Sequence, residues 1–179
     1  MARLHAANVP TTRQWTLANE LEVLTLALAA ASAALPQNAQ QIDNISHMAS
    51  ELMQQLEPGL TIGIHRDFYP DQVMIDGETV WLLDLDLYAM GDPAMDVANF
   101  LAHLDEHGLR HHGDPDALAD QCAAFVAGYD AVLPGIDRHR VNGLRFISLA
   151  RHINLSRIIP DRAGTGPRRR RWMKVSSWN

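Results

Sequence analysis

Three short stretches between residues 65 and 96 decide the fold of this 179-residue chain. Residues 65–72 read HRDFYPDQ, residues 83–86 read LDLD, and residues 91–96 read GDPAMD. Apolar runs lie at 60–64, 73–75 and 80–83, and the tight-turn pair Asp76-Gly77 separates the last two. This pattern predicts a strand, then a loop, then a small β-hairpin that carries carboxylates at its strand ends.

The polar residues of these stretches suit chemistry that depends on a metal. Pairing of the hairpin strands would bring the Gln72 amide close to the Asp84 carboxylate. Amide and carboxylate oxygens are hard ligands that suit Mg²⁺, which commonly keeps waters and substrate phosphates as its other ligands. Asp67, a few residues upstream, would then face a hydroxyl nucleophile.

Helical patterns surround this β element. Two helices are predicted before it, the first capped by Thr11 or Thr12 and running to about residue 35, the second from 38 to 56. Three helices are predicted after it, with start signals at residues 92, 114 and 137. Gly108 is predicted to end the first of these three. The fold class is therefore α+β and mainly helical.

Together these residues resemble the aminoglycoside phosphotransferase and choline kinase family of small-molecule kinases, which are relatives of protein kinases. That family has a catalytic loop H-x-D-x-x-x-x-N, a hairpin, the metal motif I-D-F/W-[DE], and G-D-P-x-x-D at the next helix. The matching residues occur here in the same order and spacing: His65, Asp67, Gln72, Asp84, Asp86, Gly91, Asp92, Pro93 and Asp96. Residues 2–6, ARLHA, resemble the helix end that follows the hinge in such kinases. The resemblance implies that residues 1–160 form a protein-kinase-like C-terminal lobe.

The resemblance also implies a role for each residue. Asp67 would orient the substrate hydroxyl and accept its proton, and Gln72 and Asp84 would hold Mg²⁺ on the phosphates of ATP. Asp86 would assist the metal or a cationic substrate. The remaining residues would be structural: His65 beneath the loop, Asp92 as a helix cap, and Asp96 bonded to the loop backbone. The implied reaction transfers the γ-phosphate of ATP to a hydroxyl of a small substrate, with Mg²⁺ and ATP as cofactors.

Two departures from the family pattern qualify this assignment. Gln72 stands where the family has Asn, and its extra methylene is expected to shift or weaken the metal site without changing its charge. The N-terminal ATP-binding lobe is expected to be absent, because no G-x-G-x-x-G occurs and the sole lysine, Lys174, lies in the basic tail. We therefore expect half of a kinase site, completed by a separate or upstream N-terminal lobe.

The sequence leaves two functions open. One is the phosphotransferase described above. The other is a catalytically inactive kinase-like fragment that binds a ligand or a protein, for which we expect a homodimer formed through the apolar surface that the missing lobe would cover.

Two further motifs are incomplete. Residues 82–86, LLDLD, also resemble the strand of haloacid dehalogenase-type phosphatases, but those enzymes need a downstream lysine and a distant acidic pair. Residues 103–107, HLDEH, match the inverted zinc-protease motif H-x-x-E-H, but no distal glutamate follows in a matching helix. Both interpretations are therefore disfavoured.

Charge is distributed unevenly along the chain. Ten carboxylates and no Lys or Arg occur between Asp67 and Glu106, which favours cation binding there. Six of the fifteen Lys and Arg residues lie in the last eighteen positions, so residues 161–179 are predicted to form a basic, flexible tail. The net charge of −6 argues against a nucleic-acid-binding protein.

The chain is expected to be cytoplasmic. Its single cysteine, Cys122, cannot form an internal disulfide, which favours a reducing compartment. The apolar run at 23–35 is shorter than the roughly 20 residues that span a bilayer. Glu20 and Glu22 also replace the positive flank of a signal peptide. This run is predicted to be a buried helix, and no membrane association is expected.

Overall fold

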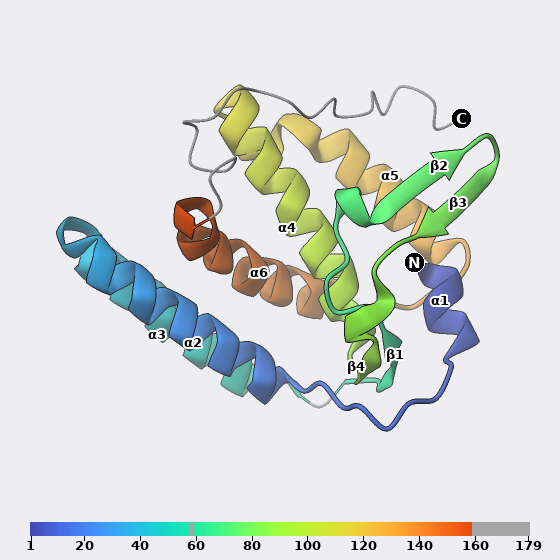
Figure 1. The fold of residues 1–179 in the computed structure, drawn as a ribbon, viewed down its shortest axis with the longest axis horizontal. Helices are drawn as coiled ribbons and strands as arrows, with labels where there is room; N and C mark the ends of the chain where they lie inside the picture. Colours follow the sequence, from blue (N-terminus) through green and yellow to red (C-terminus); the bar gives the residue numbers. More distant parts are fainter. Residues whose placement is uncertain (58, 159–179) are drawn as a thin grey trace.

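The computed structural model describes residues 1–57 and 59–158 (Figure 1). The predicted basic tail at 161–179 lies outside these residues. The described part is mainly helical, with α1 (Ala2–Ala7), α2 (Leu17–Ala34), α3 (Ala39–Gln55), α4 (Pro93–His112), α5 (Ala119–Asp130) and α6 (Arg138–Ile158). It also contains two small antiparallel sheets, so the predicted mainly helical α+β class is confirmed.

The predicted hairpin is formed by β2 (Val73–Asp76) and β3 (Thr79–Leu82). Its register pairs Val73 with Leu82 and Asp76 with Thr79, and Gly77 takes the left-handed φ of 57° that the tight turn requires. The second sheet pairs β1 (Ile62–Ile64) with β4 (Ala89–Gly91). The strand β4 was not expected. Its pairing with β1 brings residues 62–64, which precede the HRDFYPDQ stretch, next to residues 89–91, which lead into the GDPAMD stretch.

The helix α2 begins later than predicted. Thr16 is its cap, in a reciprocal pair with Asn19, instead of Thr11 or Thr12. The preceding residues are extended because they bond to β4: Trp15 N donates to Met90 O at 2.8 Å, and Met90 N donates to Arg13 O at 2.9 Å. This contact with a strand about 75 residues away leaves no local signal in the sequence.

The helix α4 begins at Asp92-Pro93 as predicted but does not end at Gly108. It continues to His112 and ends at Gly113, which has a φ of 71°. Gly108 serves packing instead, because a Cβ there would lie 2.7 Å from the backbone oxygen of Asp114. The prediction mistook a close-approach glycine for a helix terminator.

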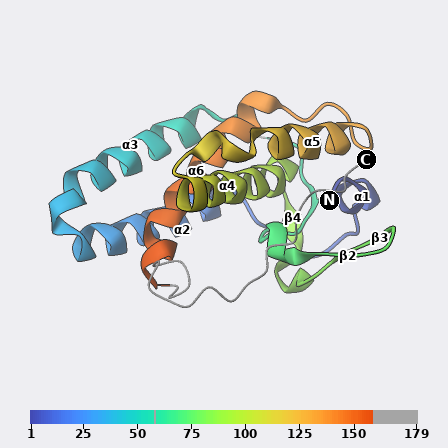
Figure 2. The ribbon, with the colours of Figure 1, turned by 90° about the horizontal axis from the view of Figure 1, so that it is seen from above.

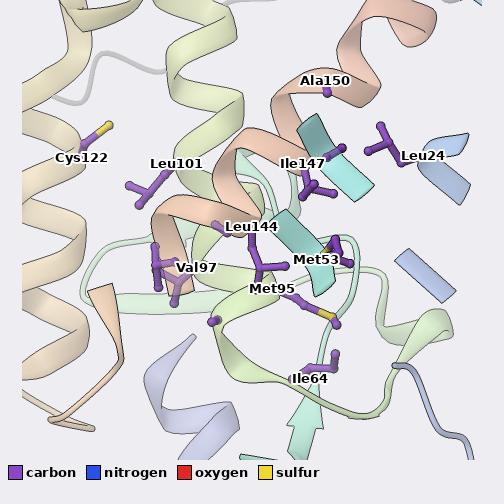
Figure 3. Close-up of a cluster of buried hydrophobic side chains, with 14 of the residues drawn as sticks. Leu24, Met53, Ile64, Met95, Val97, Leu101, Cys122, Leu144, Ile147 and Ala150 are labelled. Carbon is purple, nitrogen blue, oxygen red and sulfur yellow. The ribbon is translucent and has the colours of Figure 1, made fainter. Parts of the chain in front are cut away.

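The core lies between α4 and α6, and the antiparallel pair α2 and α3 packs on α6 (Figure 2). Figure 3 shows Val97 and Leu101 of α4 together with Leu144 and Ile147 of α6 among the side chains of this core. These four side chains are almost fully buried. They fix the start of α4, which holds the GDPAMD stretch, against the rest of the molecule.

The expectation of a buried α2 is only half correct. Leu24, Leu28 and Ala31 are buried against α3 and α6, but Val23 and Leu26 on the opposite side are 38% and 66% exposed. Among the described residues, α2 is the one helix long and apolar enough, by length and composition, to cross a membrane. Its observed neighbours are the other helices of this chain.

Candidate active site

The predicted catalytic loop follows β1 and is anchored on both sides of Asp67. Arg66 has a left-handed φ of 74°, which turns the chain sharply before Asp67. Phe68 is buried, with its ring stacked on Phe100 at 4.9 Å between centroids. Asp67 itself is half-buried between these anchors. Packing therefore holds the loop on both sides of Asp67.

Asp96 binds the backbone of this loop from beneath. Its fully buried carboxylate accepts hydrogen bonds from the amides of His65 at 2.7 Å and Arg66 at 2.8 Å. It also accepts from Nε2 of His5 at 2.9 Å, and the other ring nitrogen of His5 lies 2.8 Å from the hydroxyl of Tyr129. Burial, with Asp96 nearby, raises the pKa of Tyr129 well above its ordinary value. Residues of α1, α4 and α5 thus converge on the loop.

His65 connects the loop to the end of the hairpin. Its ring is completely buried, and Nε2 lies 2.8 Å from the backbone oxygen of Leu83. A carbonyl oxygen only accepts, so Nε2 carries the proton and donates. Leu83 N in turn donates to Gln72 O at 2.9 Å, which extends the β2–β3 ladder by one position. Gln72 and the residue before Asp84 are therefore cross-strand neighbours.

The predicted metal ligands sit around the base of the hairpin. Gln72 is buried at the end of a short 3-10 turn, Pro70–Gln72, whereas Asp84 and Asp86 are exposed. Asp84 has a left-handed backbone, with φ 57° and ψ 61°, which turns the chain out of β3. Arg13 reaches this turn by donating to the backbone oxygen of Asp86. One amide and two carboxylates offer the hard oxygen donors that Mg²⁺ prefers.

No three-residue metal cluster of the usual kind occurs in residues 1–57 and 59–158. Across these ranges, His, Cys, Asp and Glu side chains form no group of three or more that could hold a metal ion. The predicted Mg²⁺ set differs in composition because it includes the Gln72 amide. The fit of this set to Mg²⁺ therefore rests on its donor chemistry, and the ladder places Gln72 opposite Leu83, one residue before Asp84.

Asp92 fixes the first turn of α4 in two ways. Its carboxylate accepts a hydrogen bond from Ala94 N at 2.9 Å, which caps the helix. It also forms a buried ion pair with Arg140 of α6, and Arg140 donates in addition to the backbone oxygen of Glu57. The start of α4 and the beginning of α6 are thereby joined beneath the loop.

A second support of the loop was missed by sequence reasoning. Asn99 Nδ2 donates to Phe68 O at 3.0 Å, directly after Asp67. Arg151 of α6 donates to Asn99 Oδ1 at 3.3 Å and to Glu20 Oε2 of α2 at 3.1 Å. The spacing of Asn99 three residues after Asp96 places both on one helix face, which was the available signal.

Arg66 and Trp15 close this network near the surface. Trp15 Nε1 donates to Glu20 Oε1 at 2.7 Å, and the guanidinium of Arg66 lies 3.4 Å from the centroid of the Trp15 ring. Partial burial lowers the pKa of Arg66, partly offset by the charge of Glu20. The cation–π contact orients the residue immediately before Asp67.

The two incomplete motifs gain no support from the structure. The His103 ring stacks on Tyr69 at 4.7 Å and stands perpendicular to His152 at 4.5 Å, and Glu106 pairs with Arg110. The strand before Asp84 is an exposed hairpin strand and not a buried one. The His103 ring is thus engaged in packing, and the Glu106 carboxylate is engaged in an ion pair.

Comparison with known proteins identifies the family. The model of the Phosphotransferase enzyme family matches residues 1–144. A solved spectinomycin phosphotransferase in complex with ADP and spectinomycin is 16% identical, with a TM-score of 0.60, over 87% of this chain and 51% of that one. A glucosamine kinase is 21% identical, with a TM-score of 0.64, over 91% of this chain and 49% of that one.

The two solved structures resemble this chain in fold. At such identities the two solved structures show a common kinase-like fold, and the chain spans about half of their length. No curated protein matches the chain. The match of the family model over most of the described residues shows that the chain belongs to the phosphotransferase enzyme family.

Proposed function

We propose that this chain is the C-terminal lobe of a small-molecule kinase and carries the half of the site that activates the acceptor hydroxyl and holds the metal. One observation carries the proposal: the loop bearing Asp67 is bonded at the amides of His65 and Arg66 by Asp96 and at the carbonyl of Phe68 by Asn99. Catalysis of phosphoryl transfer depends mainly on such positioning.

Asp67 is the general base of the proposed reaction. Its carboxylate accepts the proton of the substrate hydroxyl while that oxygen bonds to the γ-phosphorus of ATP. The bond from the γ-phosphorus to the bridging oxygen breaks, and ADP leaves. The bonds from Asp96 and Asn99 keep the backbone on both sides of Asp67 fixed, which supports its role as a positioned base.

Gln72 and Asp84 are the proposed ligands for Mg²⁺, with Asp86 beside them to assist the metal or a cationic substrate. When bound, the metal neutralises charge on the transferred phosphate. The His65 to Leu83 bond keeps these residues in register with Asp67, because it joins the loop to the hairpin end. His65, Asp92 and Asp96 act as structural supports in this proposal.

The proposed acceptor is a small hydroxylated compound. The two structural relatives are a phosphotransferase solved with spectinomycin and a glucosamine kinase, and both names denote action on such compounds. The glycine-rich loop and the lysine that hold ATP in the family are proposed to come from a separate or upstream N-terminal lobe.

A binding module without catalysis is the second candidate. The observation that favours it is the exposure of large apolar side chains on the hairpin, where Val80 and Trp81 are 51% and 52% exposed. A surface of this kind commonly engages a partner.

Transfer of the γ-phosphate of radiolabelled ATP to spectinomycin and glucosamine, used as probe acceptors, tests the proposal. Because the lobe that holds ATP is proposed to lie outside this chain, we expect only slow Mg²⁺-dependent transfer by the wild-type chain alone and a further loss of about 100-fold or more in Asp67→Asn. Asp71→Asn, an exposed carboxylate four residues away, is the matched control and should keep the wild-type rate. Equal rates for Asp67→Asn and the wild type would overturn the role of Asp67. No transfer by any variant, together with no binding of Mg·ATP in calorimetry, would favour the binding module.

A further inference from the structure

The β2–β3 hairpin is apolar on both faces, and both faces are exposed. Met74 pairs with Trp81 and Ile75 with Val80, and neighbouring pairs of a ladder point to opposite faces. These four side chains are between 40% and 52% exposed. Figures 1 and 2 show the hairpin extending away from α2 and α3. An uncovered two-stranded hairpin is only marginally stable in water, so this element needs a cover.

The rim of the same hairpin is acidic. Asp76 ends β2 and Glu78 lies in the turn, and both are exposed. Asp84 and Asp86 are exposed at its base. Met74, Trp81 and Asp76 lie on one face of the hairpin, and we call these three residues together with Glu78 the hairpin surface. A segment that covers it must offer apolar side chains and positive charge together.

The end of this chain has that composition. Residues 167–179 read PRRRRWMKVSSWN, with five cations beside Trp172, Met173, Val175 and Trp178. We propose that residues 168–178 dock on the hairpin surface of the same molecule. The arginines would pair with Asp76 and Glu78, and the tryptophans would cover the exposed pair of Met74 and Trp81 on the same face.

The length of the chain permits this contact. Arg140 of α6 pairs with Asp92 beside the loop. From Arg140 to its last residue, Ile158, the helix α6 is about 27 Å long, at about 1.5 Å per residue. The twenty residues from 159 to 178 span up to about 66 Å when extended, at about 3.3 Å per residue. The segment can therefore return along α6 to the hairpin.

Docking would also affect the proposed catalytic site. The arginines would approach Asp84 and Asp86, so the docked segment would compete with Mg·ATP. This consequence, unlike the docking itself, rests on the proposed function.

Hydrogen–deuterium exchange of residues 73–82 in the full chain tests the docking. The tail variant combines Arg168→Glu, Arg169→Glu, Arg170→Glu and Arg171→Glu. We expect its hairpin amides to exchange at least about threefold faster than in the wild type, because the cover is lost. Adding Asp76→Lys and Glu78→Lys to the tail variant reverses the charges on the hairpin as well. Opposite charges then face each other again, so protection of the hairpin amides should be restored. Arg3→Glu with Arg157→Glu, which reverses two exposed cations elsewhere, is the control and should leave the hairpin unchanged.

Two results would overturn the docking. Equal exchange in the wild type and the tail variant would show that the tail does not cover the hairpin. Protection that falls on tenfold dilution would show that a second copy of the chain is the cover. Calorimetry with Mg·ATP separates the two proposals: the tail variant should bind more tightly than the wild type, whereas no binding by either protein would contradict the proposed function and leave the exchange result intact.

Discussion

The carboxylate of Asp96 accepts a hydrogen bond from the backbone amide of His65 at 2.7 Å, and both side chains are completely buried. The same carboxylate bonds to Arg66 N and His5 Nε2. A single side chain in the first turn of α4 thus determines the backbone path of the loop that precedes Asp67.

Asp96→Asn should destabilise the chain by about 3 kcal/mol, because the charge is lost and a buried donor is left without an acceptor. Urea unfolding measures this change. Asp120→Asn, at an exposed position in α5, should change the free energy of unfolding by less than about 0.5 kcal/mol. Similar values for the two variants would mean that Asp96 does not support the loop.

Asn99→Asp should loosen the loop on its other side. The variant keeps an acceptor for Arg151 but removes the donor to Phe68 O, which we expect to cost about 1–2 kcal/mol. Hydrogen–deuterium exchange of residues 65–70 should rise. Asn142→Asp, exposed on α6, provides the matched control. Unchanged exchange in Asn99→Asp would remove Asn99 from the support of the loop.

Gly91→Ala and Gly128→Ala should have opposite effects on stability. A Cβ at Gly91 would lie 2.7 Å from the backbone oxygen of Trp15, so we expect a loss of about 1–3 kcal/mol. A Cβ at Gly128 would meet nothing within 4 Å, and alanine in the interior of α5 should stabilise it by up to about 1 kcal/mol. Thermal unfolding of both variants measures the contrast. Equal effects would contradict the close packing of β4 on the segment before α2.

The features that could be predicted from sequence have local causes. Gly77 fixes the hairpin turn, which consists of Gly77 and Glu78 and so lies one residue later than the predicted pair Asp76-Gly77. Asp92-Pro93 fixes the start of α4 as predicted. The order of the site motifs indicated the family, which the comparison confirms. These signals need no knowledge of distant contacts.

The features that were missed depend on contacts between distant segments. The late start of α2 follows from bonds to Met90, and Gly108 serves packing against Asp114. The bond from Asn99 to Phe68 and the pair of Arg151 with Glu20 join residues 31 and 131 positions apart. Apart from the three-residue spacing of Asp96 and Asn99 on one face of α4, no local pattern indicates such pairings.

Acid should weaken the chain through His107 on α4. Burial, together with repulsion from His111 and His112, lowers the pKa of His107, and Asp71 opposes this in part. Below about pH 6.5 the unfolded chain therefore binds a proton that the folded chain does not, so the free energy of unfolding falls as the pH drops.

Urea unfolding between about pH 5 and about pH 8 measures this dependence. His107→Gln should flatten the acidic limb, whereas His139→Gln, at an exposed position in α6, should leave it unchanged. An acidic limb that is equally steep in the wild type and in both variants would show that other groups cause the pH dependence of the free energy of unfolding.

Calorimetric titration of the full chain with Mg·ATP tests most directly whether Gln72 and Asp84 form a metal–nucleotide site. The account predicts saturable heat for the wild type, a loss of about tenfold or more in affinity for Asp84→Ala, and wild-type affinity for Asp120→Ala. Equal binding by the wild type and Asp84→Ala, or no heat from any of the three proteins, would contradict it.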